Sequence, residues 1–310
     1  MSHTFNDQTP GAEITRLFPE RVRGKTCLKR GELAAATADA LAAAQASTII
    51  CTGHCQAELQ PVIDHINRKF KNVNMIFVTA DTSSLASFRE AGHAIKKIGL
   101  PIDGFIGFPS VMAAPWETTI DGFESHFQKN YPCYFLLVNL ILDVMAPGSR
   151  IVLVTSSLRT EAPAPTWVDV GFSDYHCLDG YSQSMLAVIL FVKSLSKMCG
   201  GRSITAFSAN PGNTKTNIQT LFLLIALVQP GNILSAGEDI PVLLQQAPKS
   251  LAQGSATILR GLLDPDLEEQ SGSFLDHCQT LTLPHLDFPA GQDSAAALWE
   301  RSQGFLKQFL

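Results

Sequence analysis

The sequence RIVLVTSS (residues 150–157), followed by YSQSM (residues 181–185), decides which fold the chain can adopt. Residues 150–155 are almost wholly apolar and end at two serines, which predicts a buried strand. Residues 181–198 then predict an apolar helix. A buried strand that leads into a helix is one unit of a parallel α/β sheet.

The same alternation extends to both sides of this stretch. Near-continuous apolar strands are typical of sheets that are covered on both faces. Further strands are predicted at residues 26–28, 47–52, 73–79, 102–108 and 203–209, and further helices at residues 33–46, 56–70, 85–98 and 120–145. This pattern predicts an α/β fold with a doubly wound parallel sheet.

The chain has 310 residues, enough for one large domain or two small ones. We predict one domain over residues 23–310, because no repeat or flexible linker interrupts the alternation. Residues 1–22 are polar and lack a clear period, so we expect a loosely attached, irregular arm there.

Composition excludes several classes of function. The formal net charge of −5 provides no basic surface for nucleic acid or an anionic membrane. Seven cysteines are scattered, and the pair Cys51 and Cys55, with His54 between them, has no second cluster to complete a metal site. We therefore predict no metal and no nucleic-acid partner.

The odd number of cysteines and the N-terminus, which lacks a signal-type apolar core, predict a cytoplasmic protein. The longest apolar run, residues 221–228, is far shorter than the ~20 residues of a membrane span. We expect no membrane association.

Several longer stretches carry a resemblance to a known family. They are DTSSLASFR (residues 81–89), TTIDGFESHFQKN (118–130), ITAFSANPG (204–212) and KSLAQGSATIL (249–259). With TSS and YSQSM, they resemble the retinol-dehydrogenase-like branch of the short-chain dehydrogenases/reductases over residues 24–304. The resemblance implies a Rossmann-type, seven-stranded parallel sheet with its site above the carboxyl ends of the strands.

The resemblance also implies the catalytic residues. Tyr181 matches the family's acid/base, Ser156 its substrate-orienting serine, and Asn130 the asparagine that supports a proton relay. Each also has a purely structural interpretation: Tyr181 as a helix-start aromatic, Ser156 as a strand cap and Asn130 as a bond that straightens its helix. The family's Y-x-x-x-K pattern departs here, because Met185 stands at the lysine position.

Without that lysine, we expect Tyr181 to titrate near the ordinary value of about 10. A neutral phenol is a poor base at neutral pH, but it can still donate a hydrogen bond to a developing oxyanion.

The phosphate-binding turn departs further from the family. Its pattern T-G-x-x-x-G-x-G is matched here by Arg30, Gly31, Ala35 and Thr37, so only the first glycine remains. The two replacements are expected to place side chains where phosphates need bare backbone. Lys29 and Arg30 could hold phosphate by charge instead, but the neighbouring Glu32 opposes this.

The adenosine side also differs. Gly53 and His54 stand where the family has an arginine for NADP or an acid for NAD, and residues 107–110 read GFPS in place of Asn-Asn-Ala-Gly. Only Asp81 is retained, and it could equally cap the turn before the next helix. From these losses we predict that the chain binds no nicotinamide cofactor.

Aromatic and apolar residues predict the substrate class. In the family's layout, residues 213–248 form a lid over the substrate, and an apolar lid indicates a hydrophobic carbonyl compound, such as a polyketide or terpenoid intermediate. The alternative is that these residues only cover the core. His176 could also replace Tyr181 as the base. The candidate substrate-binding residues are Trp116, Phe172, Tyr175, His176 and Leu221.

Three functions fit these observations. The leading hypothesis is a cofactor-independent enzyme that performs a cyclisation, dehydration or isomerisation. The second is a non-catalytic binding or partner subunit, and the third is a divergent NADP-dependent oxidoreductase. Titration with a nicotinamide cofactor separates the third from the other two.

We also predict a homodimer. Members of the family commonly pair through the helices that correspond to residues 120–145 and 181–198. Here those helices carry more apolar side chains than one sheet face needs, among them Phe123, Phe127, Phe135 and Ile189.

Overall fold

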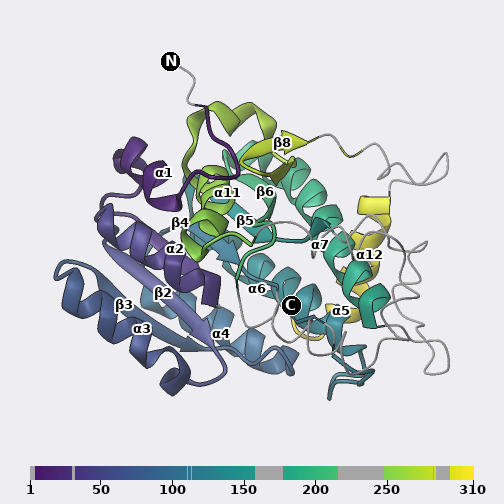
Figure 1. Ribbon diagram of the computed structural model, residues 1–310. Helices are drawn as coiled ribbons and strands as arrows, with labels where there is room; N and C mark the ends of the chain where they lie inside the picture. Colours follow the sequence, from purple (N-terminus) through teal and green to yellow (C-terminus); the bar gives the residue numbers. More distant parts are fainter. Residues whose placement is uncertain are drawn as a thin grey trace.

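The computed structural model describes residues 4–29, 32–109, 111–112, 114–157, 177–215, 248–281, 283 and 294–310. One sheet runs through the molecule with helices on both sides (Figure 1). Its strand order is β3-β2-β1-β4-β5-β6-β7-β8. The chain winds outward from β1 to β3 and then returns to β4, so the order reverses between β1 and β4, where such sheets bind ligands.

Seven strands are parallel, as predicted, and β8 adds an antiparallel edge strand to β7. The strands are β1 (Thr26–Lys29), β2 (Thr48–Gly53), β3 (Asn74–Thr79), β4 (Ile102–Gly107), β5 (Met145–Val154), β6 (Thr205–Asn210), β7 (Phe274–Asp276) and β8 (Gln279–Leu281). The predicted Rossmann-type fold is confirmed.

Helices cover both faces of the sheet. Ile49 and Ile50 are successive residues of β2 and belong to different core clusters, because side chains alternate between the faces of a strand. One cluster includes α1 (Gly11–Leu17), α2 (Glu32–Ala43), α3 (Gln56–Lys69) and α11 (Leu251–Leu263), and the other α4 (Leu85–Ile98), α6 (Pro132–Ile141), α7 (Cys177–Cys199) and α12 (Ser294–Leu306).

The helix predicted over residues 120–145 is two helices. α5 (Ser125–Asn130) ends one residue before Tyr131, and α6 begins at Pro132. Proline has no backbone N–H, and its ring collides with the carbonyl four residues earlier, so the helix breaks there. The aromatic spacing continues across the break, which explains why the sequence pattern suggested one helix.

The expectation of an irregular N-terminal arm is wrong. Residues 11–17 form α1, which packs on α11, and Phe5, Ile14 and Val22 are buried in the core. Gly11 lies so close to Ser255 of α11 that a Cβ there would collide with it. These apolar residues are too widely spaced in the sequence to form a recognisable period.

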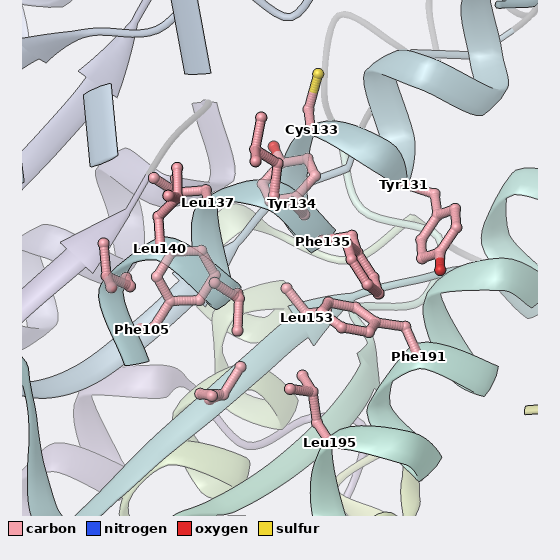
Figure 2. Close-up of a cluster of buried hydrophobic side chains, with 14 of the residues drawn as sticks. Phe105, Tyr131, Cys133, Tyr134, Phe135, Leu137, Leu140, Leu153, Phe191 and Leu195 are labelled. Carbon is pink, nitrogen blue, oxygen red and sulfur yellow. The ribbon is translucent and has the colours of Figure 1, made fainter. Parts of the chain in front are cut away.

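Helix α12 covers the apolar faces of α6 and α7. Its Trp299 ring lies 4.8 Å from Phe135 and 5.8 Å from Phe191, and Ser302 Oγ lies 2.6 Å from the Tyr131 hydroxyl. Figure 2 shows the side chains of Tyr131, Phe135 and Phe191 close to one another. The excess apolar surface on which the dimer prediction was based is therefore covered within the chain, and the homodimer stays a prediction without that support.

One described helix, residues 179–202, is long and apolar enough to cross a membrane by length and composition. It largely coincides with α7, and 67% of its most apolar window is buried inside the protein. Its apolar character follows from its place in the core. The cytoplasmic location stays a prediction.

Candidate functional site

Ser156 and Tyr181 meet at the carboxyl edge of the sheet. Ser156 follows β5, which ends at Val154, and Tyr181 lies in the first turns of α7. Their side chains form a hydrogen bond. Tyr181 is only 8% exposed, so this bond forms in surroundings that exclude most water. The structure thus brings together two residues that are well separated in the sequence, and their catalytic roles stay predictions.

Burial controls the acidity of the phenol. It raises the pKa of Tyr181 to about 12, although the hydrogen bond with Ser156 opposes the shift. The value is higher than the ordinary one expected from the sequence, because that expectation left out burial. At neutral pH Tyr181 is therefore a hydrogen-bond donor with its proton in place.

Met185 packs directly on Tyr181. It is fully buried, with Met112 against the same pair. Its backbone carbonyl accepts a hydrogen bond from Thr155 Oγ1 at 3.1 Å, which ties α7 to the end of β5. The position of the family's lysine is thus occupied by a thioether within an apolar contact, and it places no charge beside the phenol.

Asn130 links three segments around the site. Its Oδ1 accepts from the Val111 N–H at 2.9 Å, and its Nδ2 donates to the Val111 carbonyl at 2.8 Å and to Ser184 Oγ at 3.0 Å. Ser184 Oγ in turn donates to the Tyr181 carbonyl at 2.7 Å. Asn130 therefore holds the segment after β4 against the turn of α7 that carries Tyr181.

A buried pair that the sequence analysis missed supports the same segment. His126 is fully buried, its Nε2 accepts from the Ala114 N–H at 3.1 Å, and its Nδ1 lies 2.9 Å from Glu124 Oε1. Since Nε2 accepts, Nδ1 carries the proton and donates to Glu124. The ring lies edge-on to Tyr181, with centroids 6.5 Å apart. The Glu-x-His spacing is too common to have signalled this role.

Glu124 is suited to this contact. Burial raises the pKa of its carboxyl, but hydrogen bonds from His126 and from two backbone N–H groups outweigh burial and hold it below the ordinary value. Glu124 also accepts from the Phe127 N–H and caps α5. A charged carboxylate thus orients the imidazole that holds Ala114.

Of the predicted substrate-binding residues, the structure describes Trp116. It is half-buried and lies on the segment that Asn130 and His126 hold at Val111 and Ala114. Phe172, Tyr175, His176 and Leu221 lie outside the described residues, as does the predicted lid from residue 216 to residue 247.

The turn after β1 differs from the expectation. Arg30 and Gly31 lie outside the described residues, and α2 begins at Glu32, so Ala35 and Thr37 belong to a helix. Thr37 is fully buried, and its hydroxyl donates to the Leu33 carbonyl at 2.9 Å. Its side chain points into the protein, so the expectation that it obstructs phosphates is wrong.

The adenosine side carries an accessible acid–base pair. His54 follows Gly53 at the end of β2, and its Nδ1 lies 3.3 Å from Asp81 Oδ2. Asp81 Oδ1 also accepts from the Ser83 N–H at 2.9 Å, so this residue shapes the turn, whereas Ser84 caps α4. An imidazole and a carboxylate at this edge are chemically suited to hydroxyl and phosphate groups.

Phe108, which follows β4, fills space in the core: it is 4% exposed and belongs to the core cluster of Leu33 and Ala34. Elsewhere in the described part of the chain, no three His, Cys, Asp or Glu side chains gather closely enough to hold a metal ion.

The sequence profile named short chain dehydrogenase matches residues 29–222, which is more than half of the chain. The chain belongs to the short-chain dehydrogenase family. The match runs from the last residue of β1 through β6 and includes the site residues described above.

Known members of the family are similar to the chain over most of its length. Human polyprenol dehydrogenase is 28% identical over 82% of this chain and 76% of its own length. Human retinol dehydrogenase 14 is 30% identical over 73% of this chain and 66% of its own length. These relatives support the retinol-dehydrogenase-like branch. The chain spans only 61% of the human WW domain-containing oxidoreductase, to which it is 26% identical.

Solved structures agree on the fold. An uncharacterised protein from Mycobacterium paratuberculosis matches 92% of this chain and 94% of its own, with a TM-score of 0.66 and 23% identity. A short chain dehydrogenase from Burkholderia cenocepacia, solved with NADP, matches 82% and 96% with a TM-score of 0.63 and 23% identity. At these identities, the likeness shows the fold alone.

These findings overturn the leading hypothesis of the sequence analysis. The relatives of this short-chain dehydrogenase are named dehydrogenases and oxidoreductases, and no finding supports a cofactor-independent cyclisation, dehydration or isomerisation. The prediction rested on substituted glycines and on Met185. Thr37, one of those substitutions, faces the core. Fewer phosphate contacts are therefore obstructed than the sequence suggested.

The residues of this family member fit a nicotinamide nucleotide at both ends. The pair of His54 and Asp81 offers a donor and an acceptor at the adenosine end, and Ser156 with Tyr181 offers two hydroxyls at the other end. One departure lies between them, at Met185, where the family's ribose-binding lysine is missing.

Proposed function

We propose that the protein is a nicotinamide-dependent oxidoreductase that reduces a hydrophobic aldehyde or ketone to the alcohol. The observation that carries this proposal is the hydrogen bond between Ser156 and Tyr181, with the pKa of the phenol raised to about 12 by burial. A phenol that keeps its proton at neutral pH can give that proton to a carbonyl oxygen as the carbonyl is reduced.

The cofactor supplies a hydride when it is bound. Tyr181 donates its proton to the substrate oxygen, and Ser156 donates a hydrogen bond to the same oxygen. Donors held in a water-excluded site stabilise developing negative charge strongly, because they need little rearrangement during the reaction. Asn130 and His126 act as positioning residues, since both fix the segment that faces Tyr181.

The raised pKa favours reduction over oxidation. Oxidation of an alcohol needs Tyr181 as a base, and only a small fraction of a phenol with a pKa of about 12 is ionised at neutral pH. In the parent chemistry a lysine lowers this pKa, but here the buried Met185 occupies that place. The site therefore suits the direction in which the tyrosine acts as an acid.

The surroundings support an apolar substrate. Met112 and Met185 pack at Tyr181, and Trp116 lies on the same segment as Met112. Two of the relatives are named for polyprenol and retinol, which are long apolar alcohols. We infer that the substrate carries its carbonyl group on a comparable unsaturated hydrocarbon chain.

The test is reduction of retinal by NADPH or NADH, followed as retinol formed. We expect turnover by the wild type and a loss of about 10²–10³-fold in Tyr181→Phe. Tyr131→Phe is the matched control, because Tyr131 is equally buried but bonds to Ser302 in the core. If a panel of apolar aldehydes and ketones gave no turnover while the folded protein bound neither nucleotide, the proposal would fail and a non-catalytic binding subunit would be favoured.

A further inference from the structure

Lys249 is a buried lysine beside the turn that follows β6. It is 8% exposed, and its side chain lies flat along Gly212. A Cβ built on Gly212 would approach Lys249 Nζ to 3.0 Å and Cε to 3.2 Å. Gly212 also has a φ of +72°, a conformation that favours glycine. A glycine at this position therefore both permits the backbone conformation and leaves room for the Lys249 side chain.

The backbone fixes the position of this lysine. The Lys249 N–H donates to the Asn213 carbonyl at 2.7 Å, and the Lys215 N–H donates to the Lys249 carbonyl at 3.0 Å. Ser250 follows and caps α11. Lys249 is thus held between the end of β6 and the start of α11.

Its ammonium group has no partner among the residues that the structure describes. The neighbouring charges are engaged elsewhere: Arg260 pairs with Asp264 at 2.8 Å, and Asp276 accepts from Asn210 at 3.1 Å. A buried charge without a partner is costly. The start of a helix makes the position less favourable still, because the helix dipole is positive there. Such a cation is poorly placed for folding and well placed to receive an anion.

The ammonium lies one strand away from the catalytic pair. β6 is parallel to β5, with Ala209 paired to Val154, and the Thr155 N–H donates to the Ala209 carbonyl at 2.9 Å. Ser156 follows Thr155, two residues after the end of β5, and Gly212 lies two residues after the end of β6. Both therefore stand at the carboxyl edge, where such sheets bind nucleotides.

We propose that Lys249 binds the nicotinamide-side phosphate of the cofactor diphosphate and so supplies a cation to the half of the site that Met185 leaves uncharged. The inference rests on the proposed function. In the bound state, the phosphate would be the anionic partner of the buried Lys249 ammonium.

The experiment compares wild type, Lys249→Met and Lys215→Met by titration calorimetry with NADPH and with adenosine 2′,5′-bisphosphate, which lacks the nicotinamide-side phosphate. Lys215→Met is the matched control, because it removes the same charge from an exposed neighbour. We expect Lys249→Met to weaken NADPH binding by about 10- to 100-fold, the worth of a charged hydrogen bond, and to leave the bisphosphate unaffected. Lys249→Arg should retain part of the affinity.

Thermal unfolding without nucleotide provides a second readout. Because the wild type buries an unpaired charge, Lys249→Met should unfold at a higher temperature, opposite in sign to its effect on binding. If Lys249 only stabilised the fold, Lys249→Met would lower both the unfolding temperature and the NADPH affinity.

Equal NADPH affinity in Lys249→Met and wild type would overturn the inference and leave the proposed function intact. A Lys249→Met protein that is less stable than wild type would have the same consequence. A wild type that binds neither NADPH nor NADH would overturn both.

Discussion

Replacing Trp299 by alanine should unfold the contact between α12 and the two helices beneath it. The ring of Trp299 is half-buried, stacks on Phe191 with centroids 5.8 Å apart, and lies 4.8 Å from Phe135. Truncation of a buried tryptophan costs about 3–5 kcal/mol. Partial exposure places Trp299 at the lower end, so we expect a loss of about 3 kcal/mol, of which the two aromatic pairs account for about 1–3 kcal/mol.

The measurement is urea unfolding, where the change should appear as a lower midpoint with an unchanged slope. For a slope of about 3 kcal/mol per molar urea, the midpoint should fall by about 1 M. Glu300→Ala is the control, because Glu300 is the next residue of α12 and is exposed. It should change the midpoint little.

Light scattering on the same samples measures association and so tests whether α12 covers apolar faces that would otherwise bind other molecules of the protein. If α12 satisfies the apolar faces of α6 and α7, Trp299→Ala should associate more strongly than wild type, since Phe135 and Phe191 become accessible. A stability loss below about 1 kcal/mol, a fraction of the cost of a buried tryptophan, would refute the packing argument. Unchanged association would show that the exposed faces of α6 and α7 do not drive self-association.

Two further predictions concern the residues around the site. His126→Leu removes the imidazole that accepts from the Ala114 N–H and donates to Glu124, and should lower the free energy of unfolding in urea by about 1–3 kcal/mol. His126→Gln, whose amide oxygen can still accept from Ala114, should lose less; equal losses would contradict this account. The second concerns alkaline pH: because burial raises the pKa of Tyr181 to about 12, the folded protein holds this proton more tightly than the unfolded chain does, so stability should fall as pH rises above about 10. Tyr181→Phe should reduce that fall in unfolding measurements across pH 8–11, and an unchanged slope would mean that the phenol is not sealed from water.

Much of the fold could be predicted because buried parallel strands are apolar along their length. Strand β2 and the second half of β5 carry that pattern within a few residues, without reference to the rest of the chain. The role of α12 could not be predicted in this way. The packing role of Trp299 depends on Phe135 and Phe191, which lie more than a hundred positions away in the sequence.

The site shows the same division. Ser156, Tyr181 and Asn130 were identifiable because a family pattern gives their positions, and the structure brings them to one edge of the sheet. His126 follows no such pattern, since its importance comes from the backbone N–H that it meets. Lys249 was part of a recognised stretch, but its burial and its closeness to Gly212 depend on tertiary structure.

The prediction that no cofactor binds counted too many lost contacts, for a physical reason that Thr37 makes plain. A spacing pattern gives the identity of a residue at a position but does not give the direction of its side chain. Thr37 bonds back to Leu33 inside α2, so its methyl and hydroxyl groups never reach the edge where phosphates would lie. A substitution that seemed to remove a binding contact therefore removed none.

Met185, another departure from the family pattern, has a different consequence. A methionine on Tyr181 excludes water and leaves the phenol without a neighbouring cation, and both effects favour the protonated form. The same substitution that weakens the site as a base thus strengthens it as an acid. If the ammonium of Lys249 supplies charge to the cofactor from beside the turn after β6, cofactor binding and phenol acidity are no longer controlled by one side chain. The chain then keeps the proton donor and the nucleotide charge on separate elements, α7 and the turn before α11, and the protonated phenol favours the direction in which Tyr181 acts as an acid.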